Sequence, residues 1–303
     1  SGGRALKGLS RFRSSLLPHE ILFGVFLLVT WVHVLFGLGV ASVDSLVFTG
    51  LIVVNVVVLL LPLQGEGGWR WRVRLLFYPV AMNVAYLQMK TTIPRLHDGQ
   101  LKDEFLQGID ELLVGGNLSL KLEAAAHPVL TELMNICYFL YLPYVLFSLV
   151  FYLSRDLDLL KRFYSGVFSI YGIGFLGYLF VPAVGPYVAM AGEFEVELDG
   201  LWLSAWNAQF IANASNGVDV FPSLHCAVSC FFVAFDWVHT RWRFYVYVLP
   251  CLGLWVSTIY LRYHYFVDVI CGFALCALCF ALSRRVGRKP AEGESDETAA
   301  ELR

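Results

Sequence analysis

Long apolar runs, separated by short polar stretches, make up most of this 303-residue sequence. A membrane-spanning helix needs about 20 mostly apolar residues, and eight segments come close to that length. They lie at roughly 20–40, 43–63, 74–90, 128–153, 163–183, 223–239, 244–262 and 265–283. None of them alternates between polar and apolar residues as a transmembrane β-strand does. The pattern therefore predicts an all-α integral membrane protein with about eight transmembrane helices.

Two connections between these segments are long, at 91–127 and 184–222. Inside the first, apolar residues recur at helical spacing with carboxylates between them. These apolar residues are Leu101, Phe105, Leu106, Ile109, Leu112 and Leu113. Such a helix is expected to lie on the membrane surface, either framing a site or serving as a structural lid without substrate contact. Two of its carboxylates, Asp110 and Glu111, could orient an acceptor hydroxyl, although carboxylates on such a face are usually solvated.

Composition narrows the class of protein and its partners. Hydrophobic residues make up 58% of the chain and charged residues only 15%, whereas soluble domains are about one quarter charged. The net charge of −2 and the lack of a basic stripe exclude nucleic acid as a partner. The seven cysteines lie in or beside apolar segments, and the C-x-x-C of Cys276 and Cys279 has no His or carboxylate nearby. We therefore expect small core residues there, with neither a metal site nor a cofactor.

Lys and Arg residues fall almost entirely in alternate connections, which predicts how the chain is oriented in the membrane. Of the 22, seventeen belong to one side: Arg4, Lys7, Arg11, Arg13, Arg70, Arg72, Arg74, Arg155, Lys161, Arg162, Arg241, Arg243, Arg284, Arg285, Arg288, Lys289 and Arg303. The other side has only Lys90, Arg95, Lys102, Lys121 and Arg262, with the acidic run Glu193, Glu195, Glu197 and Asp199. Because basic residues concentrate on the cytoplasmic side, both termini are expected there. Both long connections then face the periplasm, the cell exterior or an organelle lumen.

The same alternation divides the chain into parts with different expected roles. They are a basic cytoplasmic segment (1–19), three N-terminal transmembrane helices (20–90), an outer amphipathic segment (91–127), a five-helix catalytic core (128–283, with its outer loop 184–222) and a disordered cytoplasmic tail (284–303). The catalytic core is expected in the last five to six helices, because the residues that can carry chemistry are found there.

Three ionisable residues stand out at the ends of apolar segments. His225 begins the sixth segment, and His264 and Asp268 lie where the seventh passes into the eighth. The predicted topology puts all three at one depth on the outer face, where ionisable residues are usually functional. Four residues separate His264 from Asp268, which on a helix gives hydrogen-bond reach. A carboxylate on one imidazole nitrogen leaves the other free to attack, and a second histidine could protonate a leaving group.

The motifs around these residues resemble those of the type 2 phosphatidic acid phosphatase superfamily. This chain has FPSLH at 221–225 and YLRYHYFVD at 260–268, where members of the superfamily carry P-S-G-H and S-R-x5-H-x3-D. The forms look closest to the inositol phosphorylceramide synthase branch, which also has a G-x-N-L-S motif like the one at 115–119. The resemblance covers about residues 90–283.

This resemblance implies a role for each residue of the motifs. His264 would be the nucleophile that takes the phosphoryl group, and Asp268 would orient it. His225 would be the general acid that later serves as the base. Ser223 would help to bind the phosphate.

Two departures from the family pattern concern the cations. The Arg expected six residues before the nucleophile is Thr258 here, and the motif K-x6-R-P is absent. Arg262, Lys90 and Arg95 are the expected substitutes, because Arg and Lys neutralise phosphate oxygens. Arg262 could equally be an anchor at the membrane interface.

A proline-glycine loop at 181–187 also matches these relatives. Pro182, Gly185, Pro186 and Tyr187 would shape the mouth through which substrate enters. The alternative is a rigid turn that closes the fifth helix.

The implied reaction transfers a phospho-headgroup or phosphoryl group from a lipid phosphate ester through a phosphohistidine, without metal or cofactor. A lipid hydroxyl acceptor, such as that of ceramide or diacylglycerol, would make the protein a headgroup phosphotransferase, which the FPSLH and HYxVD forms favour. Water as acceptor would make it a lipid phosphate phosphatase. A lipid or small-molecule transporter is the alternative from another class, although such proteins gather their polar residues near the bilayer midplane.

Overall fold

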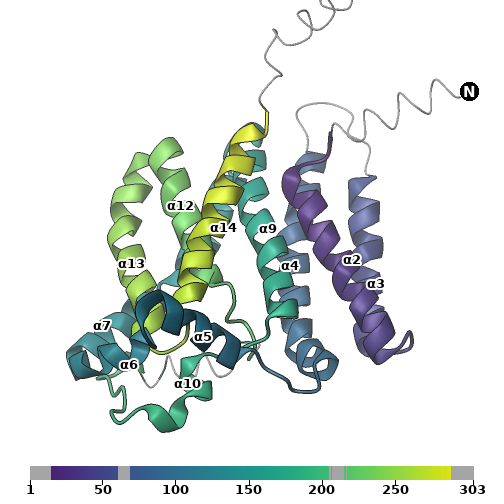
Figure 1. Cartoon of the computed structure of the whole chain (residues 1–303). Helices are drawn as coiled ribbons and strands as arrows, with labels where there is room; N and C mark the ends of the chain where they lie inside the picture. Colours follow the sequence, from purple (N-terminus) through teal and green to yellow (C-terminus); the bar gives the residue numbers. More distant parts are fainter. Residues whose placement is uncertain (1–14, 61–68, 205, 207–214, 216, 288–303) are drawn as a thin grey trace, which may run out of the picture.

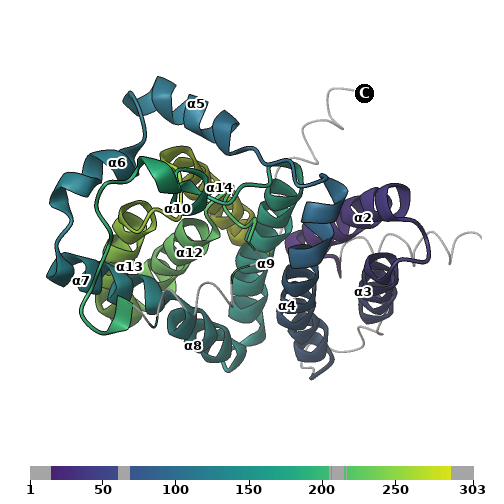
Figure 2. The same cartoon turned by 90° about the horizontal axis from the view of Figure 1, so that it is seen from below.

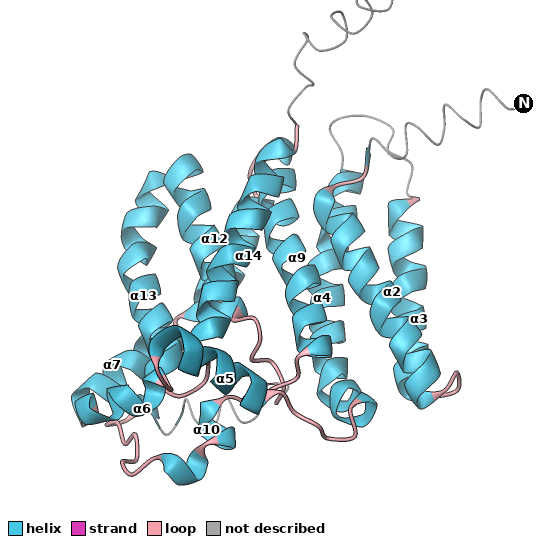
Figure 3. Ribbon diagram, in the orientation of Figure 1, coloured by secondary structure: helices cyan, strands magenta, loops and turns pink. Residues whose placement is uncertain are grey.

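A computed structural model describes residues 15–60, 69–204, 206, 215 and 217–287. Within these ranges the protein is helical, and no strand is present apart from one isolated bridge between Ala183 and Asp219. Figure 3 shows the helices with the short loops that join them. The prediction of an all-α fold is therefore confirmed for the described part of the chain.

The long helices stand roughly side by side, as Figure 1 shows. They are α2 (Pro18–Leu38), α3 (Val43–Leu59), α4 (Trp69–Leu96), α8 (Tyr141–Leu153), α9 (Leu157–Phe180), α12 (Leu224–His239), α13 (Arg241–Tyr260) and α14 (Phe266–Arg285). Helix α7 (Pro128–Phe139) lies at the lower end of the bundle in Figure 1, beside α6 (Leu118–Leu122). In the view along their axes, α9 lies between the N-terminal helices α2 to α4 and the group that contains α12, α13 and α14 (Figure 2). Helix α9 is accordingly the most buried of the helices that are long and apolar enough to cross a membrane, among the described residues.

Short helices lie across one end of this bundle. They are α5 (Asp103–Val114), α6 (Leu118–Leu122), the 3₁₀ turn η1 (Glu123–Ala125), α10 (Pro186–Ala189) and the 3₁₀ turn η2 (Ala191–Glu193). Figures 1 and 2 place α5 across the ends of the upright helices near α14. Helix α5 coincides with the amphipathic segment that the sequence predicts.

In the part of the chain that the structure describes, four helical segments are long and apolar enough to cross a membrane: Pro18–Leu38, Pro128–Leu153, Leu157–Phe180 and Phe266–Arg285. Helices α3 and α12 are apolar but shorter. These segments are those of a multi-pass membrane protein. The number of eight spans and their orientation remain predictions.

The segment expected as one span at 128–153 contains an irregularity. Helix α7 ends at Phe139 and α8 begins at Tyr141, with Leu140 between them. Pro143 explains the break, because proline has no N–H to donate to the carbonyl of residue 139 and its ring clashes with that carbonyl.

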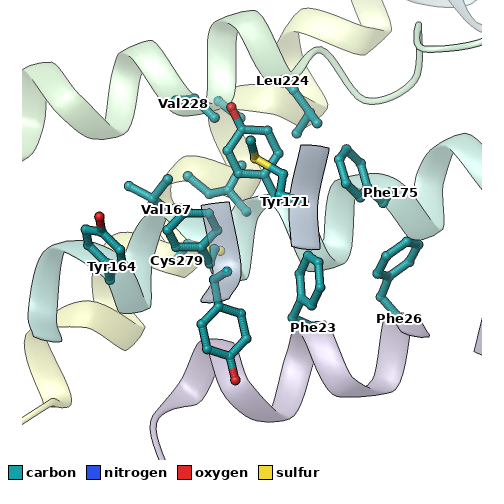
Figure 4. Close-up of a cluster of buried hydrophobic side chains, with 14 of the residues drawn as sticks. Phe23, Phe26, Tyr164, Val167, Tyr171, Phe175, Leu224, Val228 and Cys279 are labelled. Atoms are coloured by element: carbon teal, nitrogen blue, oxygen red, sulfur yellow. The ribbon is translucent and has the colours of Figure 1, made fainter. Parts of the chain in front are cut away.

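Aromatic side chains fill the core between the two groups of helices. Figure 4 shows Phe23 and Phe26 of α2 facing Tyr171 and Phe175 of α9. Gly172 permits this close packing, since a Cβ there would lie 3.0 Å from the backbone nitrogen of Phe23. Cys279 belongs to the same cluster.

Two buried ion pairs lie at the end of the bundle away from α5. Arg74 contacts Glu20 at 2.5 Å, and Arg243 contacts Asp236 at 2.9 Å, with all four side chains inaccessible to solvent. Two of the arginines that the sequence assigns to the cytoplasmic side are therefore paired inside the protein. A buried arginine needs a charged partner, and each of these two has one inside the protein. They are therefore weaker indicators of membrane orientation than exposed arginines.

Candidate active site

The structure brings together the two histidines that the motifs single out. His225 is the second residue of α12, and His264 lies in the turn between α13 and α14. Their ring centroids are 5.7 Å apart, and the ring planes are inclined at 63° to one another. His264 is buried at 3% exposure, and its backbone N–H donates to the carbonyl of Thr258 at 3.0 Å. Residues 39 apart in the chain thus share one site.

Asp268 lies beside His264, but through a different local geometry from the one expected. His264 precedes α14, so the two residues do not share a helical face. Asp268 instead caps α14: its Oδ2 accepts the backbone N–H of Tyr265 at 2.7 Å, and the same oxygen is 3.5 Å from Nδ1 of His264. The cap therefore orients the carboxylate toward the imidazole.

Backbone contacts join the two motifs. The N–H of Ser223 donates to the carbonyl of Asp268 at 3.0 Å, and a Cβ on Gly272 would lie 2.6 Å from the Ser223 carbonyl. Ser223 is fully buried, and its hydroxyl caps α12 by accepting the N–H of Cys226 at 3.4 Å. Its expected role in phosphate binding remains a prediction beside this structural role.

Three polar atoms in the site are buried without a hydrogen-bond partner among the described residues. They are Nδ1 of His225, Nδ1 of His264 and Oδ1 of Asp268. Buried polar groups in proteins nearly always have a partner, and exceptions are often catalytic. This cluster therefore has hydrogen-bonding capacity that a substrate could use.

The electrostatic surroundings of His264 keep its imidazole neutral. Burial lowers its pKa to about 4, although the charge of Asp219 and the backbone of Val220 act in the opposite direction. Desolvation disfavours the charged form of a histidine. At neutral pH the ring is therefore the unprotonated species that a nucleophile requires.

Tyrosines form one wall of the site around His225. The ring centroids of Tyr138 and Tyr141 lie 4.7 and 4.5 Å from that of His225. Tyr263 packs on Tyr138 at 4.9 Å, and the hydroxyls of Tyr141 and Tyr171 are 3.4 Å apart. The wall presents aromatic surface together with hydroxyl groups.

Arg262 is engaged by the outer loops. Its Nη2 donates to the carbonyl of Val196 at 2.6 Å and contacts Glu123 at 3.3 Å, and its guanidinium lies 3.8 Å over the ring of Phe194. Its backbone is in the left-handed region, at φ 67°, and burial lowers the pKa of its side chain despite the raising effect of Glu123. A phosphate role for Arg262 would thus have to compete with these contacts.

The other two candidate cations lie near the end of α4. Arg95 pairs with the buried Asp44 of α3 at 2.5 Å and is itself half exposed. Lys90 donates to the backbone carbonyl of Ser215 at 3.1 Å. The contacts of Arg95 thus join two N-terminal helices, whereas Lys90 reaches the outer loop that precedes the FPSLH motif.

The loop expected to shape the substrate mouth packs against the turn that carries His264. The carbonyl of Pro182 accepts the N–H of Lys102 at 2.8 Å, and the N–H of Tyr187 donates to the carbonyl of Arg262 at 2.7 Å. Gly185 has φ +81°, and a Cβ there would lie 2.5 Å from the carbonyl oxygen of Tyr263. Glycine is therefore required at that position. Pro186 follows as the first residue of α10, where proline is well suited.

Two carboxylates of α5, those of Asp103 and Asp110, are buried, whereas Glu104 and Glu111 are exposed. Asp110 is 1% exposed and accepts the N–H groups of Phe266 and Val267 at 2.8 and 2.9 Å. Asp103 accepts the N–H of Gly185 at 2.9 Å and the hydroxyl of Tyr265 at 2.8 Å. The expectation of a solvated Asp110 is wrong, because this residue caps the first turn of α14.

The structure adds Asp219, which motif analysis does not single out. Its carboxylate accepts hydrogen bonds from the hydroxyls of Tyr86 and Ser215, and its charge acts on both His225 and His264. Its position four residues before Ser223, inside a long polar loop, carries no recognisable signal. Among the described residues, no group of three or more His, Cys, Asp or Glu side chains could hold a metal ion.

Comparisons with known proteins agree with the motifs. Residues 106–282 match the model of the PAP2 superfamily. A phosphoinositol dihydroceramide synthase of Bacteroides thetaiotaomicron is 29% identical over 150 residues, which cover 44% of this chain and 48% of the relative. An inositol phosphorylceramide synthase of Candida albicans is 38% identical over 76 residues, covering 24% of this chain and 16% of the relative.

The matched region therefore spans half or less of these curated relatives. No solved structure gives a significant match. The family match nevertheless covers more than half of the chain and includes every residue of both histidine motifs. The chain belongs to the PAP2 superfamily, within which it is similar to the inositol phosphorylceramide synthase-like branch.

Proposed function

We propose that this protein is a membrane enzyme that transfers a phospho-headgroup from a lipid donor to the hydroxyl of a lipid acceptor. The observation that carries the proposal is the cluster of His225, His264 and Asp268, in which two imidazoles face one another and a carboxylate supports one of them. The names of the two relatives, both synthases of phosphoinositol ceramides, support a transferase.

In the first half of the reaction, His264 acts as the nucleophile. Asp268 faces Nδ1, so Nε2 attacks the phosphorus of the donor. The P–N bond forms as the bond from phosphorus to the diacylglycerol oxygen breaks, and the imidazolium of His225 gives its proton to the departing alkoxide. The products of this half are free diacylglycerol and a headgroup-phosphoryl His264.

In the second half, the acceptor replaces the lipid that left. Neutral His225 takes the proton of the acceptor hydroxyl, whose oxygen attacks phosphorus while the P–N bond to His264 breaks. His264 returns to its neutral form and His225 again holds a proton. Each cycle thus restores both histidines, and the net change is exchange of one lipid hydroxyl for another.

An apolar cavity next to the site supports a lipid substrate. It has a volume of about 350 Å³ and lies between α8 and α13, lined by residues that include Tyr141, Tyr247 and Pro250. Tyr141 also contacts the ring of His225, so the cavity adjoins the reacting groups. Part of a lipid acyl chain bound in this cavity would be removed from water, which is favourable, while the headgroup of the same lipid lies at the histidines.

A lipid phosphate phosphatase would use the same residues, with water as the second nucleophile. The burial of His264 and the tyrosine wall around His225 favour transfer, because both limit access of water to the phosphorylated intermediate.

We propose that the reaction takes place on the non-cytoplasmic face. The transverse helices cover one end of the bundle (Figure 1), and α4 and α13 begin at the other end, with Arg70, Arg72 and Arg241 in their first turns.

The test is product analysis by mass spectrometry with purified protein in mixed micelles. Labelled phosphatidylinositol is supplied alone, with ceramide, or with diacylglycerol. Headgroup transfer to an acceptor is the expected result. Release of free phosphate or of headgroup phosphate without transfer would establish hydrolysis. Binding of lipid without any turnover would instead favour a transporter.

A further inference from the structure

The charge of Asp219 acts on both His225 and His264. The next residue, Val220, makes a backbone hydrogen bond with His264, yet the proposed reaction does not use the Asp219 carboxylate. Ser215 donates to its Oδ1 at 2.6 Å and Tyr86 donates to its Oδ2. The isolated bridge between Ala183 and Asp219 ties its backbone to the mouth loop. Side chains from α4 and from the outer loop therefore hold this half-buried carboxylate in place.

No cation forms an ion pair with Asp219 within the described residues. Arg262 is paired with Glu123 and Arg95 with Asp44. Lys90 donates to the carbonyl of Ser215, so one exposed ammonium stands near the carboxylate. Water screens exposed charges more strongly than buried ones, so the exposed Lys90 ammonium offsets only part of the negative charge of Asp219.

We propose that Asp219 selects phosphodiester lipids over phosphomonoester lipids at this site. A phosphodiester carries one negative charge, whereas a monoester carries close to two near neutral pH. Each additional negative charge on the substrate is repelled by a carboxylate held next to the reacting phosphorus. The proposal rests on the proposed function, because it assumes that the phosphoryl group binds between His225 and His264.

Coulomb's law gives the size of the effect. At an effective dielectric constant of about 20, the repulsion between two unit charges several ångströms apart is on the order of 2 kcal/mol, which corresponds to a change of about thirtyfold. Partial solvent exposure of Asp219 reduces this value. We therefore expect removal of the charge to raise the kcat/KM ratio of monoester to diester about tenfold.

The experiment compares phosphatidic acid with phosphatidylinositol for the wild type, Asp219→Asn and Asp219→Glu. The Asn variant should raise the monoester-to-diester ratio about tenfold, and the Glu variant, which keeps the charge, should stay close to the wild type. Glu195→Gln is the matched control, because it removes an equal but exposed charge from the same outer loop. An unchanged ratio in Asp219→Asn, whether or not the overall rate falls, overturns the proposal.

A binding measurement keeps this test separate from the proposed reaction. The affinities of methyl phosphate, which is a dianion at pH about 8, and of dimethyl phosphate, a monoanion, are measured for wild type and Asp219→Asn by titration calorimetry. A tighter methyl phosphate complex in the variant, without a matching gain for dimethyl phosphate, supports charge selection even if no lipid is turned over. Equal gains for both anions, or none, would refute it. The melting temperature of each variant shows whether it is folded.

Discussion

The contact between Asp110 and α14 predicts that a residue outside both histidine motifs controls the geometry of the site. Asp110 reaches from α5 to the N–H groups of Phe266 and Val267, at 2.8 and 2.9 Å. These are among the first N–H groups of α14, which have no partner inside that helix. Asp268 occupies the same turn, so loss of the contact should disturb the carboxylate that faces His264.

The magnitude follows from the two hydrogen bonds. Replacing a capping carboxylate by alanine costs about 0.5–2 kcal/mol, and leaving a buried donor unsatisfied costs about 1–3 kcal/mol. Because Asp110 is 1% exposed, water cannot readily replace it. Asp110→Ala should therefore lower the free energy of unfolding by about 2–4 kcal/mol. It should also lower kcat more than it raises KM, since the change acts on the orientation of Asp268.

The assay measures thermal unfolding in detergent together with headgroup transfer. Glu111→Ala is the matched control, because Glu111 is the next residue of α5 but is exposed, and it should behave like the wild type. Asp110→Asn keeps one acceptor oxygen and should lose about half of the stability that Asp110→Ala loses. If Asp110→Ala melts and transfers like the wild type, the cap is not important and our explanation of the α5 contact is wrong.

Four further predictions concern the site and its surroundings. His264→Ala and Asp268→Asn should abolish transfer and leave a folded protein by gel filtration and melting; full activity in either would exclude the proposed mechanism. Burial lowers the pKa of His264 to about 4, so protonation inactivates this nucleophile only below about pH 5. A plot of kcat/KM against pH should therefore fall on its acidic side with an apparent pKa near 4. An apparent pKa near 6.5 would mean that the effect of Asp219 outweighs that of burial. Treatment with a chelator should change transfer by less than about twofold, and a strict metal requirement measured by add-back would contradict this. Val246→Trp, at the edge of the cavity beside Tyr141, should raise KM for long-chain donors and leave soluble short-chain donors unaffected; equal effects on both would separate the cavity from lipid binding.

The sequence by itself determined the helical class and the main motifs, because both depend on local patterns. About 20 apolar residues are needed to cross a bilayer whatever the rest of the chain does, so the boundaries of α2 and α14 could be placed within a few residues, whereas α9 begins six residues before the predicted start. The pairing of His225 with His264 could also be anticipated, since both lie at segment ends expected at one depth. The side of the membrane on which each segment end lies follows from the predicted topology, because the chain changes sides with every span.

Only the tertiary structure decided which groups surround the histidines. Asp219 is brought to the site by the fold of a long polar loop, and Asp110 by the position of α5 across the end of α14. Arg262 contacts Glu123, which is 139 residues away in the chain. Such contacts join residues far apart in sequence, and their free energy depends on distance and burial. A pattern of residue types along the chain contains neither quantity.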